Sequence, residues 1–255
     1  MTLRLDMAWL MATLLVSVRV ATATALTSVL GPTQIPAPAR VILVLAISAL
    51  LISTAALPTM AIASLAALLM AVASEAIIGL AFAFGFIAAY AATQIAGRIL
   101  DTQIGFGAAG ILNPATQTVS PLLANLFGML AIAVFLALDG HLVLFKALSL
   151  SLQAMPPGSR LSAETWPSIV THSSVSFLFA LSLAGPVMGL LLLSDVALAA
   201  IARSMPQLNV LVLGFAIKIM LGMVGLALGI RLARSVLEPL FATTFQYWDG
   251  LTLSR

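Results

Sequence analysis

Residues 41 to 74 of this chain contain no charged side chain, and this long apolar run limits what the chain can fold into. A helix that crosses the hydrocarbon core of a bilayer needs about 20 mostly apolar residues. The composition agrees, because 62% of all residues are hydrophobic, 7% are charged and the mean hydropathy is +1.18. Soluble domains are closer to half apolar and a quarter charged. The sequence therefore predicts an integral membrane protein.

Clusters of proline and glycine, rather than runs of charge, divide the chain into about six apolar segments. Both residue types interrupt helices. The expected segments are residues 7–30, 41–57, 61–96, 122–155 with a break at Asp139-Gly140, 175–193 and 208–230. Residues 61–96 form one long helix or two stacked ones, closed by Arg98 and Asp101. We expect an all-α, polytopic helical membrane protein in which some helices are broken and the last two segments form a helical hairpin.

The first apolar segment has an alternative interpretation as a cleavable signal peptide. Arg4 precedes the segment, and the small residues of 21–25 resemble a cleavage site. Asp6 and Arg19 fit a signal peptide badly. We therefore expect a first helix that is retained.

Three ionisable residues lie near the middle of apolar segments: Arg19, Glu75 and Lys218. A charge at the bilayer centre costs roughly 2.5 to 3.5 kcal/mol on insertion scales, so such residues usually face protein or water. One interpretation is that Glu75 neutralises Arg19 or Lys218 inside a helical bundle. The other is a proton or ion relay, for which a single carboxylate without acidic neighbours makes a poor path. We favour the structural pair, with the partner of Glu75 left open.

Residues 101–121 form the second unusual feature, because they combine four breakers with two prolines and contain no lysine or arginine. The breakers are Gly105, Gly107, Gly110 and Asn113. Irregular backbone at membrane depth survives only where protein buries it or where it lines a water-filled path. The stretch is therefore a candidate gate. The alternative is a re-entrant connector between two helices.

The residue inventory argues against an enzyme. Cysteine is absent, and the two histidines, His141 and His172, have no metal-binding spacing, acidic cluster or glycine-rich phosphate loop around them. We expect no catalytic residue, metal or cofactor. Asp139 stands close to His141, but Asp-Gly between two apolar segments is more simply a helix stop and restart with the aspartate side chain as cap. Since lysine and arginine form no cluster, nucleic acid is not an expected partner.

Two glycine pairs have the spacing that lets membrane helices approach each other closely. They are Gly185 with Gly189, and Gly225 with Gly229. The signal is weak alone, because glycine is common in membrane helices.

The most specific pattern in the chain lies between Arg203 and Lys218, where Met205-Pro-Gln-Leu-Asn209 is followed by Val212-Leu-Gly-Phe215. It resembles the signature of the flagellar biosynthesis protein FliR family, the export-gate component of flagellar type III secretion. Supporting blocks are Arg19, the turn of residues 35–40, Gln103-Ile-Gly105, Asn113-Pro-Ala115 and Asp139-Gly-His141. The resemblance covers about residues 15 to 235.

This resemblance implies a single-copy subunit of a closed protein-export pore in the bacterial inner membrane, within the flagellar basal body. The implied partners are FliP-like, FliQ-like and FlhB-like gate subunits, the basal body ring and unfolded export substrates. Residues 1–255 would form a single polytopic unit. Within it, residues 1–160 would be similar to FliP, and residues 161–255 would supply a FliQ-like hairpin and the carboxyl tail.

The resemblance also implies that a loop between helices plugs the pore. This loop falls on Gly105, Phe106, Gly107, Ala108, Ala109, Gly110, Ile111, Leu112, Asn113 and Pro114. A second implied site, a contact with neighbouring gate subunits, is the turn of Met205, Pro206, Gln207, Leu208 and Asn209. The alternative for the turn is a helix cap, with Pro206 in a first helical turn.

Two other functions stay open. Virulence secretion relatives share the Pro-Gln-Leu-Asn turn but usually differ in the Leu-Gly-Phe that follows, so residues 213–215 favour the flagellar system. A small secondary transporter would need a polar midplane site between matching halves with broken helices. No such symmetry is visible in the sequence.

Overall fold

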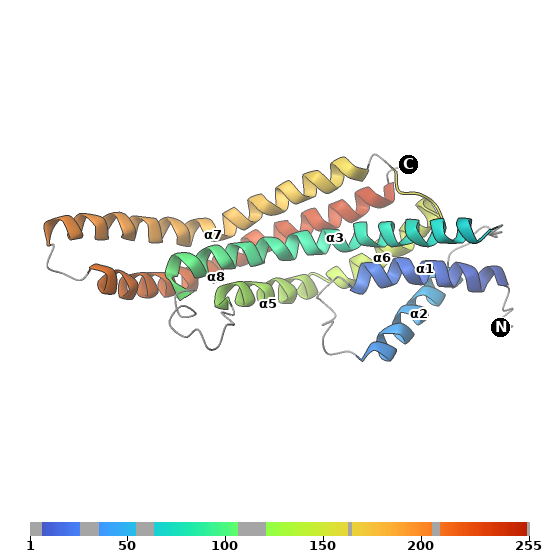
Figure 1. The fold of residues 1–255 in the computed structure, drawn as a ribbon, viewed down its shortest axis with the longest axis horizontal. Helices are drawn as coiled ribbons and strands as arrows, with labels where there is room; N and C mark the ends of the chain where they lie inside the picture. The colour runs from blue at the N-terminus through green and yellow to red at the C-terminus, as the bar shows by residue number, and fades with distance from the viewer. Residues whose placement is uncertain are drawn as a thin grey trace. The chain divides into compact units, whose positions relative to one another are not determined.

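Apolar α-helices form the regular structure of the described part of the chain, which comprises residues 7–25, 36–54, 64–106, 121–162, 165–205 and 210–253 of a computed structural model. The helices are α1 (Met7–Ala25), α2 (Ala37–Thr54), α3 (Leu65–Ile104), α5 (Leu122–Ala137), α6 (Gly140–Ala154), α7 (Thr165–Ser204) and α8 (Val210–Leu253) (Figure 1). The expected all-α fold is confirmed.

Several of these helices have the length and composition of membrane spans. Residues Met7–Thr24 of α1, and the whole of α3 and α7, are long and apolar enough to cross a bilayer. Helices α5 and α6 pass the same test as a pair that is bent by 64° at the break between them. Helix α2 and residues Leu213–Ala227 of α8 are shorter apolar segments. The chain is a polytopic membrane protein, as its sequence predicts.

Helix α3 is a single helix of 40 residues, which selects the one-helix alternative. It was expected to close at Arg98 and Asp101, and this is wrong, because it continues to Ile104. Both charges are accommodated without a break, since Arg98 is exposed and the buried Asp101 carboxylate bonds to α5. The helix ends where Gly105 takes a left-handed φ of 93°.

Helix α7 is also longer than expected. It runs for 40 residues, so the predicted connection that begins at Ser194 is wrong. Ser194 stays helical and donates its hydroxyl hydrogen to the Leu191 carbonyl at 2.6 Å, which satisfies the side chain inside the helix. Helix α8 begins at Val210 and continues past the expected end at residue 230.

The predicted stop and restart at Asp139 is confirmed, but its predicted mechanism is wrong. Asp139 has a left-handed backbone with φ 54° and ψ 28°, and its side chain makes no capping bond. Its main-chain carbonyl instead accepts the amides of Leu142 at 2.9 Å and Val143 at 3.1 Å. These two main-chain bonds form the first turn of α6 without the carboxylate.

The helices pack into two compact units. The first contains Met1–Ala88, Asp139–Ser173 and Thr243–Arg255, and the second contains Ala89–Leu138 and Ser174–Ala242. Helices α3, α7 and α8 each contribute residues to both units. The division of the chain at residue 160 into parts similar to two other gate subunits stays a prediction.

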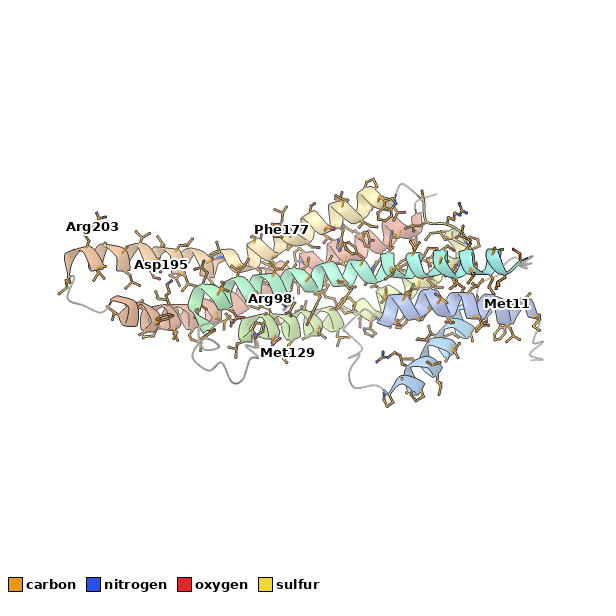
Figure 2. All side chains as sticks on the ribbon, viewed as in Figure 1. Met11, Arg98, Met129, Phe177, Asp195 and Arg203 are labelled. Atoms are coloured by element: carbon orange, nitrogen blue, oxygen red, sulfur yellow. The ribbon has the colours of Figure 1, made fainter. Side chains whose placement is uncertain are left out.

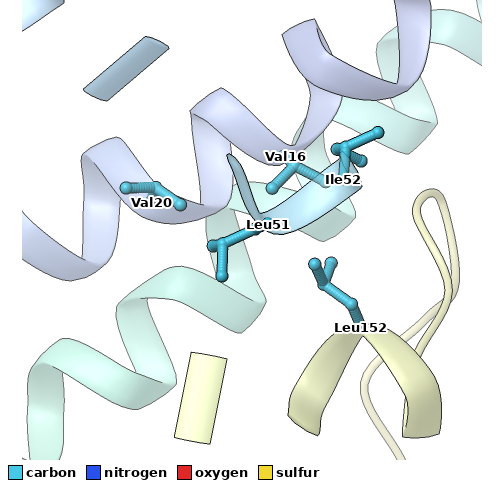
Figure 3. Close-up of a cluster of buried hydrophobic side chains, with 5 residues drawn as sticks. All are labelled: Val16, Val20, Leu51, Ile52 and Leu152. Carbon is cyan, nitrogen blue, oxygen red and sulfur yellow. The ribbon is translucent and has the colours of Figure 1, made fainter. Parts of the chain in front are cut away.

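Aliphatic side chains from α1, α2 and α6 form a buried core in the first unit. Its members are Val16, Val20, Leu51, Ile52 and Leu152 (Figure 3). Burial of each such side chain stabilises a fold by roughly 1.5 to 3 kcal/mol in water, and packing contributes in a membrane as well. The crossing of α1 and α2 is fixed by this cluster.

Three ring side chains also attach α7 and α8 to α3 in the first unit. The contacts are Tyr247 Oη to Ala81 O at 2.9 Å, Trp248 Nε1 to Phe82 O at 2.8 Å, and His172 Nε2 with Gly85 O at 3.0 Å. The rings of His172 and Tyr247 stack, with centroids 4.7 Å apart. Burial raises the pKa of the Tyr247 hydroxyl, which keeps it protonated as a donor.

The two glycine pairs differ in the second unit. A Cβ at Gly225 would meet Val187 of α7 at 3.1 Å, and one at Gly229 would meet it at 3.5 Å, so these glycines lie against α7. A Cβ at Gly185 or Gly189 would meet no described atom within 4 Å. Within the described residues, close packing therefore uses the pair on α8, and the expectation for the pair on α7 stays a prediction.

Gly79 marks a very close approach of α3 to α1, and we expect Gly79→Ala to destabilise the protein. The new Cβ would overlap the carbonyl oxygen of Arg19 and Oγ1 of Thr22. Since a backbone atom cannot move aside like a flexible side chain, we expect the free energy of unfolding to fall by about 1 to 3 kcal/mol. A lower Tm in detergent measures it. Gly189→Ala is the matched control on open helix surface, and equal losses in both variants would contradict the packing.

Candidate functional site

A buried ion pair joins α1 to α3 in the first unit. Arg19 Nε donates to Glu75 Oε2 at 2.7 Å, and Arg19 Nη2 donates to Oε1 at 3.0 Å. The two side chains are 1% and 0% exposed. The planar guanidinium fits a carboxylate in this two-bonded geometry, which is strong and directional. The structure thus pairs Glu75 with Arg19 and not with Lys218.

Groups at the end of α6 and in the following turn make further hydrogen bonds to the two side chains of the ion pair. Arg19 also donates to Ser151 Oγ at 2.9 Å and to the Met155 carbonyl at 3.0 Å. The amide of Gly158 donates to Glu75 Oε1 at 2.8 Å. Such additional bonds matter, because the free-energy cost of removing two charges from water can otherwise exceed the gain from their mutual attraction. This saturation supports a structural role for the pair over a proton relay.

Lys218 has a different partner in the second unit. Its Nζ lies 2.7 Å from Oδ1 of Asp195 on α7, with side-chain exposures of 24% and 38%. Asp195 is labelled on α7 in Figure 2. Solvent-exposed pairs contribute only about 0 to 1 kcal/mol in water. Asp195 was missed in the sequence because its position was expected to be a connection.

Of the predicted plug residues, the structure describes Gly105 and Phe106, and residues 107–114 lie outside the described ranges. Gly105 has a φ of 93°, which glycine adopts without the steric cost that other residues carry. A Cβ there would lie 2.9 Å from Cε1 of Phe215. Glycine at this position therefore ends α3 and lets a side chain of α8 approach the backbone.

A carboxylate joins the two helices that flank the predicted plug. Asp101 of α3 accepts the amide of Leu123 at 3.0 and 3.2 Å and the amide of Ala124 at 3.2 Å. Helix α5 has no side-chain cap of its own, because Pro121 occupies its N-cap position. A carboxylate satisfies these free amides and interacts favourably with the positive end of the helix dipole. We call the junction between the end of α3 and the start of α5 the loop base, and Asp101 belongs to it.

Close packing of α3 and α5 reinforces this base. A Cβ at Gly97 would overlap the backbone of Ala124, and a Cβ at Gly128 would overlap Nε2 of Gln94. Gln94 Nε2 also donates to the Ala124 carbonyl at 2.9 Å. The end of α3 and the start of α5 are thereby held at fixed positions on both sides of residues 107–120.

Loss of the Asp101 carboxylate should loosen the loop base. We expect Asp101→Ala to cost about 1 to 3 kcal/mol, because two buried amides lose a charged acceptor. Asp101→Asn should cost less, since its carbonyl oxygen can still accept one of them. Protease cleavage between residues 105 and 121 measures the effect. Asp249→Ala, at an exposed position, is the control. Identical cleavage of all the variants would contradict the role of the Asp101 carboxylate in joining α3 to α5.

Only the first residue of the predicted contact turn can be placed. Met205 is 55% exposed, and its amide donates to the Ile201 carbonyl at 2.9 Å, directly after α7. Residues 206–209 lie outside the described ranges. Both interpretations of the turn, a subunit contact and a helix cap, stay predictions.

The histidines lie apart from these features. His172 contacts the α3 main chain and stacks on Tyr247. Nδ1 of His141 is buried without a hydrogen-bond partner among the described atoms. In the same ranges, no three histidine, aspartate or glutamate side chains are grouped to hold a metal ion.

Comparison with known proteins gives matches over most of the chain. Residues 10–244 match the family described as bacterial export proteins, family 1. The chain is 34% identical over 170 residues to the flagellar biosynthetic protein FliR of Escherichia coli, an alignment that covers 66% of this chain and 65% of that protein. It is 29% identical over 180 residues to FliR of Bacillus subtilis, covering 69% and 70%. Identity to the surface presentation of antigens protein SpaR of Shigella flexneri is 30% over 145 residues, covering 57% and 56%.

Proposed function

Because this chain belongs to family 1 of the bacterial export proteins, we propose that it is a subunit of the flagellar type III protein export gate. The observation that carries the proposal is the family match, which extends over residues 10–244 and includes every described helix in whole or in part. Two relatives named flagellar biosynthetic protein FliR support the flagellar assignment. The work of such a subunit is to form a sealed path, and no covalent chemistry is required.

The proposed plug is the segment from Gly105 to Pro114. In the closed gate, Phe106, Ile111 and Leu112 pack across the lumen and exclude water and ions. Gly105, Gly107 and Gly110 give the backbone the freedom to fold aside when an unfolded chain enters. The anchored base at Asp101 supports this proposal, because a seal must open and return to one position. Charged side chains are absent from residues 105–114, as a seal against ions requires.

Arg19 and Glu75 serve as scaffold in this proposal. They hold α1, α3 and α6 together through bonds that are internal to the first unit. An ion pair with so many partners leaves no free carboxylate oxygen for proton transfer among the described groups. We propose that export energy enters elsewhere in the assembly.

The proposed partners are FliP-like, FliQ-like and FlhB-like subunits, and the proposed location is the inner membrane within the flagellar basal body. Exposed apolar side chains on α7 and α8 support contacts of this kind. Val196, Met220, Met223 and Val224 are each more than half exposed. The turn of residues 205–209 is proposed to join the same contact with neighbouring subunits.

A virulence type III secretion system is the second candidate. The observation that favours it is the 30% identity to SpaR of Shigella flexneri over 145 residues. The flagellar relatives match longer parts of this chain. The flagellar system therefore remains our proposal.

Deletion of the gene distinguishes the two systems. The proposal predicts that flagellar proteins disappear from the culture supernatant and that motility is lost, with both restored by a plasmid copy. Loss of effector secretion with normal motility would support the virulence system instead. If both kinds of secretion persist, the export function itself is overturned.

A further inference from the structure

A cavity lies between the second half of α1 and the first half of α2, within the first unit. Its volume is about 340 Å³, and the walls include Val18, Ala21, Thr22, Arg40, Val41 and Val44. In Figure 1, α2 runs obliquely to α1 and approaches it at its carboxyl-terminal end, where Leu51 packs in the core with Val20. Pockets of this volume hold small ligands or parts of larger ones.

One positively charged side chain, that of Arg40, stands among the described residues that line this cavity. Arg40 is the only lysine or arginine between residues 20 and 97. None of the described lining residues is acidic. The guanidinium carries five N–H donors in a planar fork, and this geometry fits the oxygens of a phosphate. Arg40 already makes another contact within the chain, and the fork allows several contacts at once.

The hydroxyl groups of the cavity can act as acceptors. Thr22 donates its hydrogen to the Val18 carbonyl at 2.9 Å, and Thr24 donates to the Val20 carbonyl at 2.7 Å. Thr24 makes a further contact within the chain, and a hydroxyl oxygen has two lone pairs, so a ligand with hydroxyl groups of its own suits this wall.

The polar groups of the cavity lie where a lipid headgroup would sit, and its apolar wall continues along α2, where an acyl chain would lie. Residues Met7–Thr24 have the character of a membrane span, and the threonines lie at its carboxyl end, where a lipid headgroup would sit. The aliphatic surface of α2 continues from the cavity, with Val41 58%, Ile42 67% and Leu45 39% exposed. An inorganic phosphate would gain nothing from this apolar surface, whereas an acyl chain would.

We propose that the cavity between α1 and α2 binds an anionic phospholipid. The phosphodiester oxygens accept hydrogen bonds from Arg40, and hydroxyl groups of a glycerol headgroup donate to the threonine oxygens. An acyl chain lies along Val41, Val44 and Leu45. A lipid bound in this way fills the opening beside the buried core in which Val16 and Val20 of α1 meet Leu51 and Ile52 of α2.

The experiment uses full-length protein extracted from membranes in mild detergent with its co-purifying partners, and delipidated. Tm is measured with added phosphatidylglycerol, phosphatidylethanolamine or inorganic phosphate. We expect phosphatidylglycerol alone to raise Tm. Arg40→Gln should weaken the effect at least about tenfold in lipid concentration, because one strong charge-assisted contact is lost. Ala21→Phe, which fills the cavity, should abolish it.

Lys146→Gln is the matched control, because it removes a positive charge from an exposed position of α6 outside the cavity. An equal loss of lipid response in this variant would overturn the proposal. Stabilisation by inorganic phosphate alone would do the same, since it would reveal a simple anion site. If the co-purified lipid of Arg40→Gln equals that of the wild type, or a neighbouring protein cross-links into the cavity in place of lipid, the proposal is also overturned.

Discussion

Arg19→Met is expected to destabilise the protein by about 3 to 5 kcal/mol, because it leaves Glu75 as a buried charge without its partner. Glu75 is fully buried and would keep only the amide of Gly158 among its present ligands. Ser151 and the Met155 carbonyl would lose a donor at the same time. The variant should accumulate poorly in membranes and show a much lower Tm.

Glu75→Leu should be similarly damaging, since it leaves the Arg19 guanidinium uncompensated. The double variant Arg19→Met/Glu75→Leu removes both charges and should recover much of the loss, because apolar replacement of a buried pair is often tolerated. Lys218→Met removes a charge from a partly exposed pair and serves as control, with an effect of about 0 to 1 kcal/mol. Additive losses in the double variant would contradict coupling between the two residues.

Deletion of residues 107–111 is expected to make the assembled gate leak protons and small solutes. The deletion removes Ile111 and two of the three glycines of the proposed plug, so the shortened segment should no longer seal the proposed lumen. We expect the membrane potential of cells to fall when the variant is expressed with its partners. Growth should slow in parallel.

Conservative changes in the same segment provide the control for leakage. Ile111→Leu and Leu112→Ile keep apolar volume and should leave the pore closed, whereas Ile111→Asp should open it by drawing in water. Because the loop base at Asp101 is untouched, assembly should be normal in each variant. Unchanged permeability in an assembled deletion variant would show that residues 105–114 are only a connector.

The sequence identified which charges matter but not how they pair. Arg19, Glu75 and Lys218 stand out because each is an expensive charge within an apolar segment. Choosing the partner of Glu75 requires the relative rotation of three helices. Hydropathy along the chain contains no such information. Ser151 and Gly158, which complete the pair, look ordinary in the sequence.

Asp101 shows a second limit of prediction. A charged residue after a long apolar run is a reasonable helix end. Here, however, the carboxylate accepts hydrogen bonds from main-chain amides 22 and 23 positions later. One signal was available, because Pro121 precedes the first residue of α5 and a proline side chain cannot cap the helix. An uncapped helix start in an apolar chain calls for an acceptor from another segment.

Helix lengths were underestimated for a physical reason. Ser194 and Asp195 interrupt an apolar run in the sequence, yet both are satisfied in the structure, one by its own helix and one by Lys218. Among the described residues, a neighbouring helix lies against the glycine pair on α8 but not against the pair on α7. In both cases the deciding factor is the neighbouring helix, which local periodicity does not reveal.

Co-purification from native membranes tests the proposed function most directly. The chain is tagged at its own chromosomal position, membranes are extracted in mild detergent, and the proteins that remain bound are identified and counted. Membership of the flagellar export gate predicts FliP-like and FliQ-like subunits in a fixed ratio to one copy of this chain. Recovery of the chain alone, or with unrelated membrane proteins under conditions that preserve its fold, would contradict it.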